Sequence, residues 1–230
     1  MVARRRTAIV AVVLLLAACG PPTQEPRPAD GGPAVVRHAD PRELSGTAVD
    51  PPLARPTQTL LDTEGQGFSF ADRPEDELTV AFFGYTHCPD LCPTTMADLA
   101  TALRMLPDDL IKRVTVAFVT EDPDRDTSRA LRSWLDRFDP SFVGLIGGNR
   151  ASRVILKELY STETRQLARP EKPIKHPGPG HEHHEHGSYG IEHTGTVYAF
   201  GPGGTSVIYT GGTKPSEYAA DFTALLEPAK

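Results

Sequence analysis

The sequence lacks features that mark several common classes of protein. Basic residues are not in excess, since 24 Lys and Arg stand against 30 Asp and Glu, a formal net charge of −6 at pH 7. Binding to nucleic acid draws its energy from clustered Lys and Arg, so this balance argues against a nucleic-acid surface. No repeat at solenoid spacing occurs, and three cysteines confine thiol chemistry to three positions. With 39% hydrophobic and 23% charged residues over 230 positions, the composition is that of a globular protein of one moderate domain or two small ones.

Long apolar runs are also missing. The run Ala8 to Leu16 follows three arginines and is shorter than the about 20 apolar residues of a spanning helix. A positive segment, an apolar segment and the ending Leu16-Ala-Ala-Cys19 resemble the signal and lipobox of bacterial lipoproteins. We therefore expect residues 1–18 to be a lipoprotein signal peptide and Cys19 to carry lipid, which would hold the protein on the cell membrane, facing outside the cytoplasm. The alternative is an ordinary secretory signal with a chance cysteine.

Prolines concentrate in two stretches of the chain. Residues 20–57 hold nine of the 22 prolines and few aromatic residues, so they cannot bury enough apolar surface to offset the entropy of ordering. We expect residues 19–57 to be a lipid-anchored, proline-rich linker. The second stretch, 170–190, contains five of the eight histidines and is predicted to be a His-rich loop. It would lie within a domain that spans residues 58–230.

Within that domain, strand and helix patterns alternate. Residues 58–70 predict a hairpin around the turn residues 63–67, and two runs that are apolar on both faces, 78–85 and 114–119, predict central strands. Helical spacing of apolar residues occurs at 96–106, 131–138, 154–159 and 218–226, and further strand patterns at 142–146, 196–200 and 205–209. The predicted fold is α/β, with a central mixed sheet flanked by helices and an N-terminal hairpin.

Two cysteines remain for chemistry if Cys19 is lipidated. Cys88 and Cys92 lie just after the first predicted central strand, at its carboxyl end, where open α/β sheets bind ligands. Their i, i+4 spacing places both sulfurs on one side of a first helical turn, where the helix N-terminus lowers thiol pKa values. Two converging thiolates suit a soft ion such as Cu(I), or a reversible disulfide. The plainer alternative is a structural disulfide, which is common in exported proteins.

Three segments together resemble motifs of the SCO/SenC family, in the order that the family has them. The first is the copper motif, Phe82-Phe-Gly-Tyr-Thr-His-Cys-Pro-Asp-Leu-Cys-Pro93. The second is Thr120-Glu-Asp-Pro-Asp-Arg-Asp-Thr127, after the second core strand. The third is Ile191-Glu-His-Thr-Gly-Thr-Val-Tyr-Ala-Phe200, where the family places a distal histidine just before a strand. The resemblance covers roughly residues 58–228.

This resemblance implies a thioredoxin-like fold and a copper metallochaperone. Such a protein delivers copper to the dinuclear copper site of cytochrome c oxidase, or prepares that site. The implied copper ligands are Cys88, Cys92 and His193; two thiolates and one imidazole suit trigonal Cu(I), and Cu(II) accepts the same ligands with an added oxygen or nitrogen donor. Implied partners are the copper-site subunit of the oxidase, a periplasmic or extracellular copper donor and a thiol reductase.

The dithiol also fits functions of another class. A thiol–disulfide oxidoreductase would use Cys88 and Cys92 to reduce the oxidase cysteines before the metal arrives, and a peroxidase-like thiol protein or a redox or copper sensor would use the same pair. A thioredoxin-type enzyme has two residues between its cysteines, whereas this chain has three. Whether the protein is an enzyme therefore stays open at this stage, with chaperoning favoured.

Three acidic residues after the second predicted central strand raise a separate question. Asp122, Asp124 and Asp126 resemble a calcium loop only superficially, because an EF-hand requires Gly and Glu where this chain has Thr127 and Ser133. In the resembling family this loop borders the copper site, so we expect Asp122 to lie beside the ligands or to contact a partner. The alternative is charge at the start of a helix for which Thr127 is the predicted N-cap.

The remaining histidines carry weaker predictions. His87 should point away from the thiol of Cys88 and face solvent or support the site from behind. The cluster His181-Glu-His-His-Glu-His186, preceded by His176, departs from the family pattern. Clustered imidazoles bind Cu(II), Ni or Zn, so an auxiliary metal site is favoured over a merely solvated loop.

Overall fold

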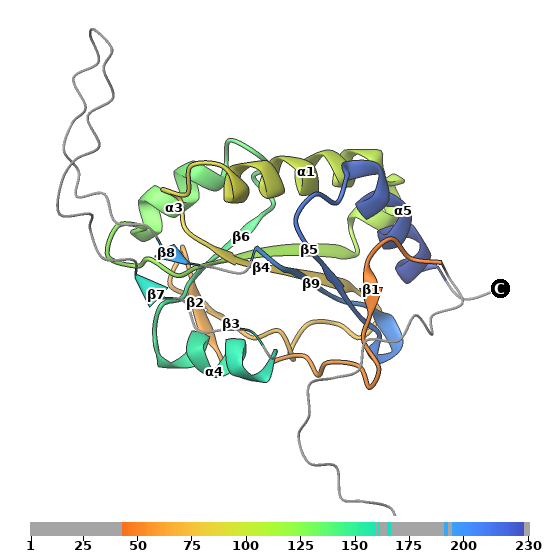
Figure 1. Ribbon diagram of the computed structural model, residues 1–230, viewed down its shortest axis with the longest axis horizontal. Coiled ribbons are helices and arrows are strands. Elements are labelled where there is room, and N and C mark those ends of the chain that lie inside the picture. The colour runs from red at the N-terminus through yellow and green to blue at the C-terminus, as the bar shows by residue number, and fades with distance from the viewer. Residues whose placement is uncertain (1–42, 160, 162–164, 167–190, 193–194, 228–230) are drawn as a thin grey trace, which may run out of the picture. The chain divides into compact units, whose positions relative to one another are not determined.

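The computed structural model describes residues 43–159, 161, 165–166, 191–192 and 195–227 (Figure 1). Its main sheet has eight strands in the order β1-β10-β9-β4-β5-β6-β2-β3. Strands β4, β5 and β6 are parallel and every other pair in this sheet is antiparallel. The bounds are β1 Thr47–Ala48, β2 Leu60–Asp62, β3 Gly67–Phe68, β4 Leu78–Gly84, β5 Val114–Thr120, β6 Val143–Ile146, β9 Val197–Phe200 and β10 Ser206–Tyr209.

Helices cover both faces of this sheet. Helices α1, α3 and α5 lie on one face and α4 lies on the other (Figure 1). A small separate ladder pairs β7 with β8 in antiparallel fashion. The bounds are α1 Leu91–Met105, α2 Asp108–Ile111, α3 Ser128–Leu135, α4 Arg150–Glu158, α5 Pro215–Leu226, β7 Arg165–Gln166 and β8 Ile191–Glu192, with a 3₁₀ turn at Pro202–Gly204.

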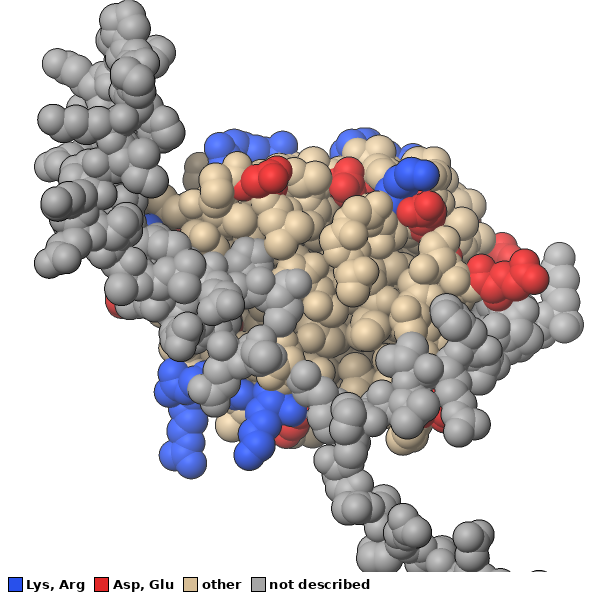
Figure 2. Space-filling model, in the orientation of Figure 1, with Lys and Arg blue, Asp and Glu red and all other residues tan. Residues whose placement is uncertain are grey.

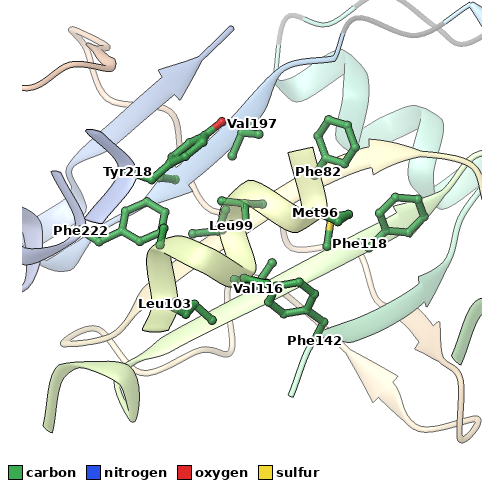
Figure 3. Packing of buried hydrophobic residues seen from close by; sticks show 14 of the residues in the cluster. Phe82, Met96, Leu99, Leu103, Val116, Phe118, Phe142, Val197, Tyr218 and Phe222 are labelled. Carbon is green, nitrogen blue, oxygen red and sulfur yellow. The ribbon is translucent and has the colours of Figure 1, made fainter. Parts of the chain in front are cut away.

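The central strands are buried on both faces, as their sequence pattern predicts. Along β4, Val80 and Phe82 point toward α1, whereas Ala81 and Phe83 belong to the core on the α4 side. Figure 3 shows Phe82 in the first core with Met96, Leu99 and Leu103 of α1 and the aromatic rings of neighbouring elements. Full burial of one such side chain stabilises the fold by about 1.5–3 kcal/mol. These two cores hold the carboxyl end of β4, and with it the start of α1, in a fixed place.

The predicted α/β fold, the mixed central sheet with flanking helices, and the N-terminal hairpin are confirmed. The hairpin is β2 and β3, closed by Asp62, whose carboxylate accepts the backbone N–H groups of Glu64 and Gln66. Thr127 caps α3 as predicted, because its side chain accepts a hydrogen bond from the backbone of Ala130.

The segment 43–57, which the proline content predicts to be linker, lies against the domain in the structure. Strand β1 pairs with β10, and Asp221 of α5 accepts the backbone N–H groups of Ser45 (3.0 Å) and Gly46 (2.8 Å). Farther along, the Arg55 guanidinium donates to four backbone carbonyl oxygens, among them that of Phe200 at 3.2 Å. The segment is ordered by partners distant in sequence, which its own composition does not reveal. We refer to residues 43–57 as the docked segment.

Candidate metal centre

The two cysteines stand on the turn that joins β4 to α1. Cys92 is the second residue of α1 and is fully buried, whereas Cys88 lies three residues before the helix and is 8% exposed. The backbone N–H of Cys92 donates to the Cys88 sulfur at 3.4 Å, and the N–H of Cys88 donates to the carbonyl oxygen of Tyr85 at 3.2 Å. The two thiols therefore meet at the helix start, as predicted, although only Cys92 belongs to the helix.

The environment of Cys92 changes the expected thiol chemistry. The sequence predicts thiol pKa values lowered by the helix N-terminus, but burial raises the pKa of Cys92 well above its ordinary value. A hydrogen bond from the backbone at Tyr85 acts in the opposite direction and is outweighed. Without metal, the Cys92 side chain is thus a neutral thiol at neutral pH. Because thiolate is the form that binds metal, loading a soft cation there releases a proton.

Gly84, the last residue of β4, makes room for this thiol. A Cβ atom at this position would lie 2.6 Å from the Cys92 sulfur and 3.2 Å from the Phe82 ring. Any side chain at Gly84 would push against both groups. The glycine of the motif therefore leaves the space that the side chain of Cys92 occupies.

Asp126 is the residue of this site that sequence reasoning missed. Its carboxylate is fully buried and accepts hydrogen bonds from the backbone N–H of Thr86 (2.8 Å), from the Thr86 hydroxyl and from the Thr120 hydroxyl (2.6 Å). It thus connects the turn that carries the thiols to the end of β5. A sequence signal is present, because Asp126 lies in the second family motif, but spacing along the chain does not show that its carboxylate meets Thr86 and Thr120.

Asp122, predicted to lie beside the ligands or to contact a partner, belongs to the same loop as Asp126. Asp122 is almost fully buried, and its carboxylate accepts a hydrogen bond from the Arg125 guanidinium, which lies 5.8 Å from the centre of the Tyr85 ring. It does not cap α3, because that role belongs to Thr127. His87 is half exposed, and its Nδ1 lies 3.5 Å from an Asp126 carboxylate oxygen. This agrees with the expectation that His87 faces solvent beside the site.

The third predicted ligand, His193, lies outside the described residues, as do Cys19 and the cluster His181–His186. The chain is described again from Gly195 onward. Gly195 has a positive φ of 64°, and a Cβ on it would overlap the side chain of Leu91, the residue before Cys92. The residue two positions after His193 therefore packs at the start of α1.

Cys88 and Cys92 are a pair of metal-ligating side chains that the start of α1 brings together. Among the described residues, no group of three or more His, Cys, Asp or Glu side chains is arranged to hold a metal ion. The dithiol nevertheless fits a soft cation, because two sulfurs meet at a helix start in a space that Gly84 leaves open.

The distribution of charged side chains on the surface agrees with the slight excess of acidic residues in the sequence. On the face shown in Figure 2, Lys and Arg side chains of the described residues stand in small separate groups among acidic ones, with no continuous basic field. No helix within the described ranges is both long and apolar enough to cross a membrane.

Fold and site together define a thioredoxin-like protein with a buried dithiol between its central strand and the following helix. The model of the SCO1/SenC family matches residues 50–227, and the chain belongs to this family. The family resemblance read from the three motifs is thereby confirmed, and so is the thioredoxin-like fold.

Similar proteins are found among sequences and structures alike. The human protein SCO1 homolog, mitochondrial, is 32% identical over 154 residues, which are 64% of this chain and 44% of that protein. A putative copper-binding protein of Stutzerimonas stutzeri is 30% identical over 157 residues, 66% of each chain. The chain thus spans under half the length of the human relative and just under two thirds of the bacterial one. The structure of Bradyrhizobium japonicum ScoI with copper bound is 28% identical with a TM-score of 0.59, covering 75% of this chain and 99% of that one.

Proposed function

We propose that this protein is a copper-binding metallochaperone that delivers copper to, or prepares, the dinuclear copper site of cytochrome c oxidase. The observation that carries the proposal is the pair of buried thiols, Cys88 and Cys92, which meet at the start of α1 in a chain of the SCO1/SenC family. Thiolates are ligands that Cu(I) prefers, so copper is the metal that this site suits. The copper-bound ScoI structure supports the same choice.

His193 is proposed as the third ligand. Support comes from Gly195, two residues further on, which packs against Leu91 beside Cys92. The same stretch then enters β9, where Val197 pairs with Phe82 near the end of β4. The described chain from Gly195 to Val197 thus runs beside the start of α1 and the carboxyl end of β4, next to the thiol turn. An imidazole completes a trigonal donor set for Cu(I) and supports Cu(II) when a further donor is added.

The cellular setting is part of the proposal. Residues 1–18 would be removed as a signal peptide, Cys19 would carry lipid, and the chain from there to the docked segment would serve as the tether. The protein would then work at the membrane outside the cytoplasm, with the copper-site subunit of the oxidase as recipient, and a copper donor and a thiol reductase as further partners. A Cys19→Ser variant that keeps its membrane attachment, with no lipid on its N-terminal peptide by mass spectrometry, would contradict this setting.

The decisive test is anaerobic titration of the reduced protein with Cu(I) against a calibrated competitor. We expect one Cu(I) per chain at high affinity, and a loss of at least about a hundredfold in Cys88→Ser or Cys92→Ser, because a hydroxyl is a poor donor to a soft ion. Met96→Leu is the matched control: it removes a fully buried sulfur one helical turn beyond Cys92 and nearly conserves volume, so copper binding should not change.

Two further measurements separate the proposal from its competitors. His193→Ala should weaken Cu(II) most and alter its thiolate-to-copper absorption, whereas the dithiol should oxidise nearly as in the unmodified protein. In copper-limited cells, the double variant Cys88→Ser, Cys92→Ser should fail to support oxidase activity. Oxidase activity restored by that double variant would refute the proposed function, and rapid turnover of disulfide substrates with weak copper binding would favour a reductase.

A further inference from the structure

Asp126 places a buried negative charge beside the thiol turn. Its carboxylate is fully buried and accepts the three hydrogen bonds from Thr86 and Thr120 described above. The Asp126 backbone N–H donates to the carbonyl oxygen of Asp122 at 2.8 Å, so hydrogen bonds hold both the side chain and the backbone of this residue. A buried carboxylate is costly unless it is hydrogen-bonded or paired. These bonds satisfy both carboxylate oxygens and, at the same time, restrain the turn two residues before Cys88.

The carboxylate lies beside the turn that carries the thiols. It accepts the N–H of Thr86, and the N–H of Cys88, two residues further on, donates to the carbonyl oxygen of Tyr85, the residue before Thr86. The His87 imidazole at 3.5 Å is half exposed and therefore largely screened by water. The Arg125 guanidinium is engaged with Asp122. Asp126 itself is fully buried, so water does not screen its charge in the same way.

We propose that Asp126 is a positioning residue with a second effect on metal preference: it fixes the thiol turn against β5, and its buried charge favours Cu(II) over Cu(I) in the dithiol site. This inference rests on the proposed copper function. Cu(II) carries one more positive charge than Cu(I), so a fixed negative charge in a poorly solvated environment stabilises the Cu(II) complex more. In a family site that accepts both oxidation states, such a charge sets how strongly each is retained.

The substitution Asp126→Asn separates position from charge. The amide oxygen can still accept from the Thr86 N–H and the Thr120 hydroxyl, and the amide nitrogen can donate to the Thr86 hydroxyl. We expect the ratio of Cu(II) to Cu(I) affinity to fall roughly tenfold. For this one-electron couple, that change corresponds to a rise of about 59 mV in the potential of the bound copper. Both affinities are measured by competition on the purified full-length protein.

Two control variants test the alternatives. Asp124→Asn removes the same charge from an exposed position on the same loop, where water screens it, and should leave the ratio unchanged. Asp221→Asn alters another buried carboxylate that accepts backbone N–H groups, but at the docked segment; it should lower stability without moving the ratio. An unchanged ratio in folded Asp126→Asn, or an equal change in Asp221→Asn, would overturn the proposed effect of the charge.

A metal-free measurement tests the positioning role. Because the Thr86 N–H donates to Asp126, hydrogen exchange at that amide should be nearly normal in Asp126→Asn and at least about tenfold faster in Asp126→Ala. If Asp126→Ala does not fold, Thr120→Val, which deletes one hydrogen bond to the carboxylate, should accelerate the same exchange to a smaller extent. Unchanged exchange in these variants would refute the positioning role. Failure of the copper function itself is seen separately, as Cu(I) binding that Cys88→Ser does not weaken.

Discussion

The thiol turn and the docked segment are held by the same kind of hydrogen bond, to a buried aspartate. In each, a buried aspartate accepts backbone N–H groups of an irregular stretch: Asp126 holds the turn at Thr86, and Asp221 holds Ser45 and Gly46. They differ in what surrounds the carboxylate. Asp126 stands next to thiols and hydroxyl groups, whereas Asp221 lies among the rings of α5 and β10, including Tyr209. A buried aspartate that accepts backbone N–H groups can therefore serve two purposes. At the thiol turn it supports a site for chemistry, and at α5 it attaches a chain segment to the domain.

The largest expected effect comes from removing the restraint at the docked segment. Asp221→Ala leaves the N–H groups of Ser45 and Gly46 without their acceptor, and an unsatisfied buried donor costs about 1–3 kcal/mol. We expect a loss of about 3 kcal/mol in the free energy of unfolding, measured by urea denaturation. Limited proteolysis should show faster cleavage within residues 43–57, with Cu(I) binding retained. Equal resistance to protease in both proteins would show that Asp221 does not hold the segment.

Alkaline pH should lower the folding stability that comes from the thiol turn and from the rings beside the docked segment. The two losses should begin at different pH values. Burial raises the pKa of Tyr218, which packs on Tyr209, to about 12 from an ordinary value near 10. The neutral phenol therefore adds stability that is complete below about pH 10 and is lost as the pH rises toward 12, about 3 kcal/mol in all. The raised pKa of Cys92 makes its contribution decline earlier, from about pH 9.

Unfolding midpoints measured between pH 8 and 12 check this order. Tyr218→Phe should flatten the decline above pH 10, and Cys92→Ala should flatten its earlier part, both without metal. A pH profile that neither substitution changes would mean that other groups cause the alkaline loss.

Added methyl groups compare the packing of the two regions. Gly84→Ala would place a Cβ 2.6 Å from the Cys92 sulfur, and Gly46→Ala would place one against the Tyr209 ring and Val207. Overpacking of this kind costs about 1–3 kcal/mol. Both variants should therefore lose stability by about 2 kcal/mol, yet only Gly84→Ala should also weaken Cu(I) binding. Thermal denaturation and copper titration of the pair measure this, and weakened binding in Gly46→Ala would contradict the separation of the two regions.

The smallest expected effects are at single threonines. Thr120→Val removes the hydroxyl that donates to Asp126 and accepts the Asp122 N–H (3.1 Å), so the unfolding free energy should fall by about 2 kcal/mol in urea denaturation. Thr127→Ala, which removes the N-cap of α3, should cost about 1 kcal/mol and leave the copper preference unchanged. A change in copper preference in Thr127→Ala would contradict the special place of the hydrogen bonds to Asp126.

Periodicity in the sequence was sufficient for the regular part of the fold. Strands β4 and β5 are apolar on both faces, and the helices α1, α3 and α5 carry apolar residues at helical spacing, so local pattern and burial agree. The motif around Cys88 and Cys92 could likewise be placed at the strand-to-helix turn. The predicted roles of His193, Cys19 and His181–His186 stay predictions, because these residues lie outside the described part of the chain.

Long-range hydrogen bonds and burial decided the rest. The docked segment has the composition of a linker, yet Asp221, the edge of β10 and the bonds of Arg55 help to order it, across 145 or more positions of sequence for several of these contacts. The pKa of Cys92 follows from the low polarity around it and not from its place at a helix start. The contacts of Asp126 depend on the sheet, because β4 and β5 end side by side and so bring Thr86 and Thr120 to one carboxylate. Spacing along the chain determined which residues carry thiols, whereas the solvent exclusion and charge around those thiols arose from the packed sheet.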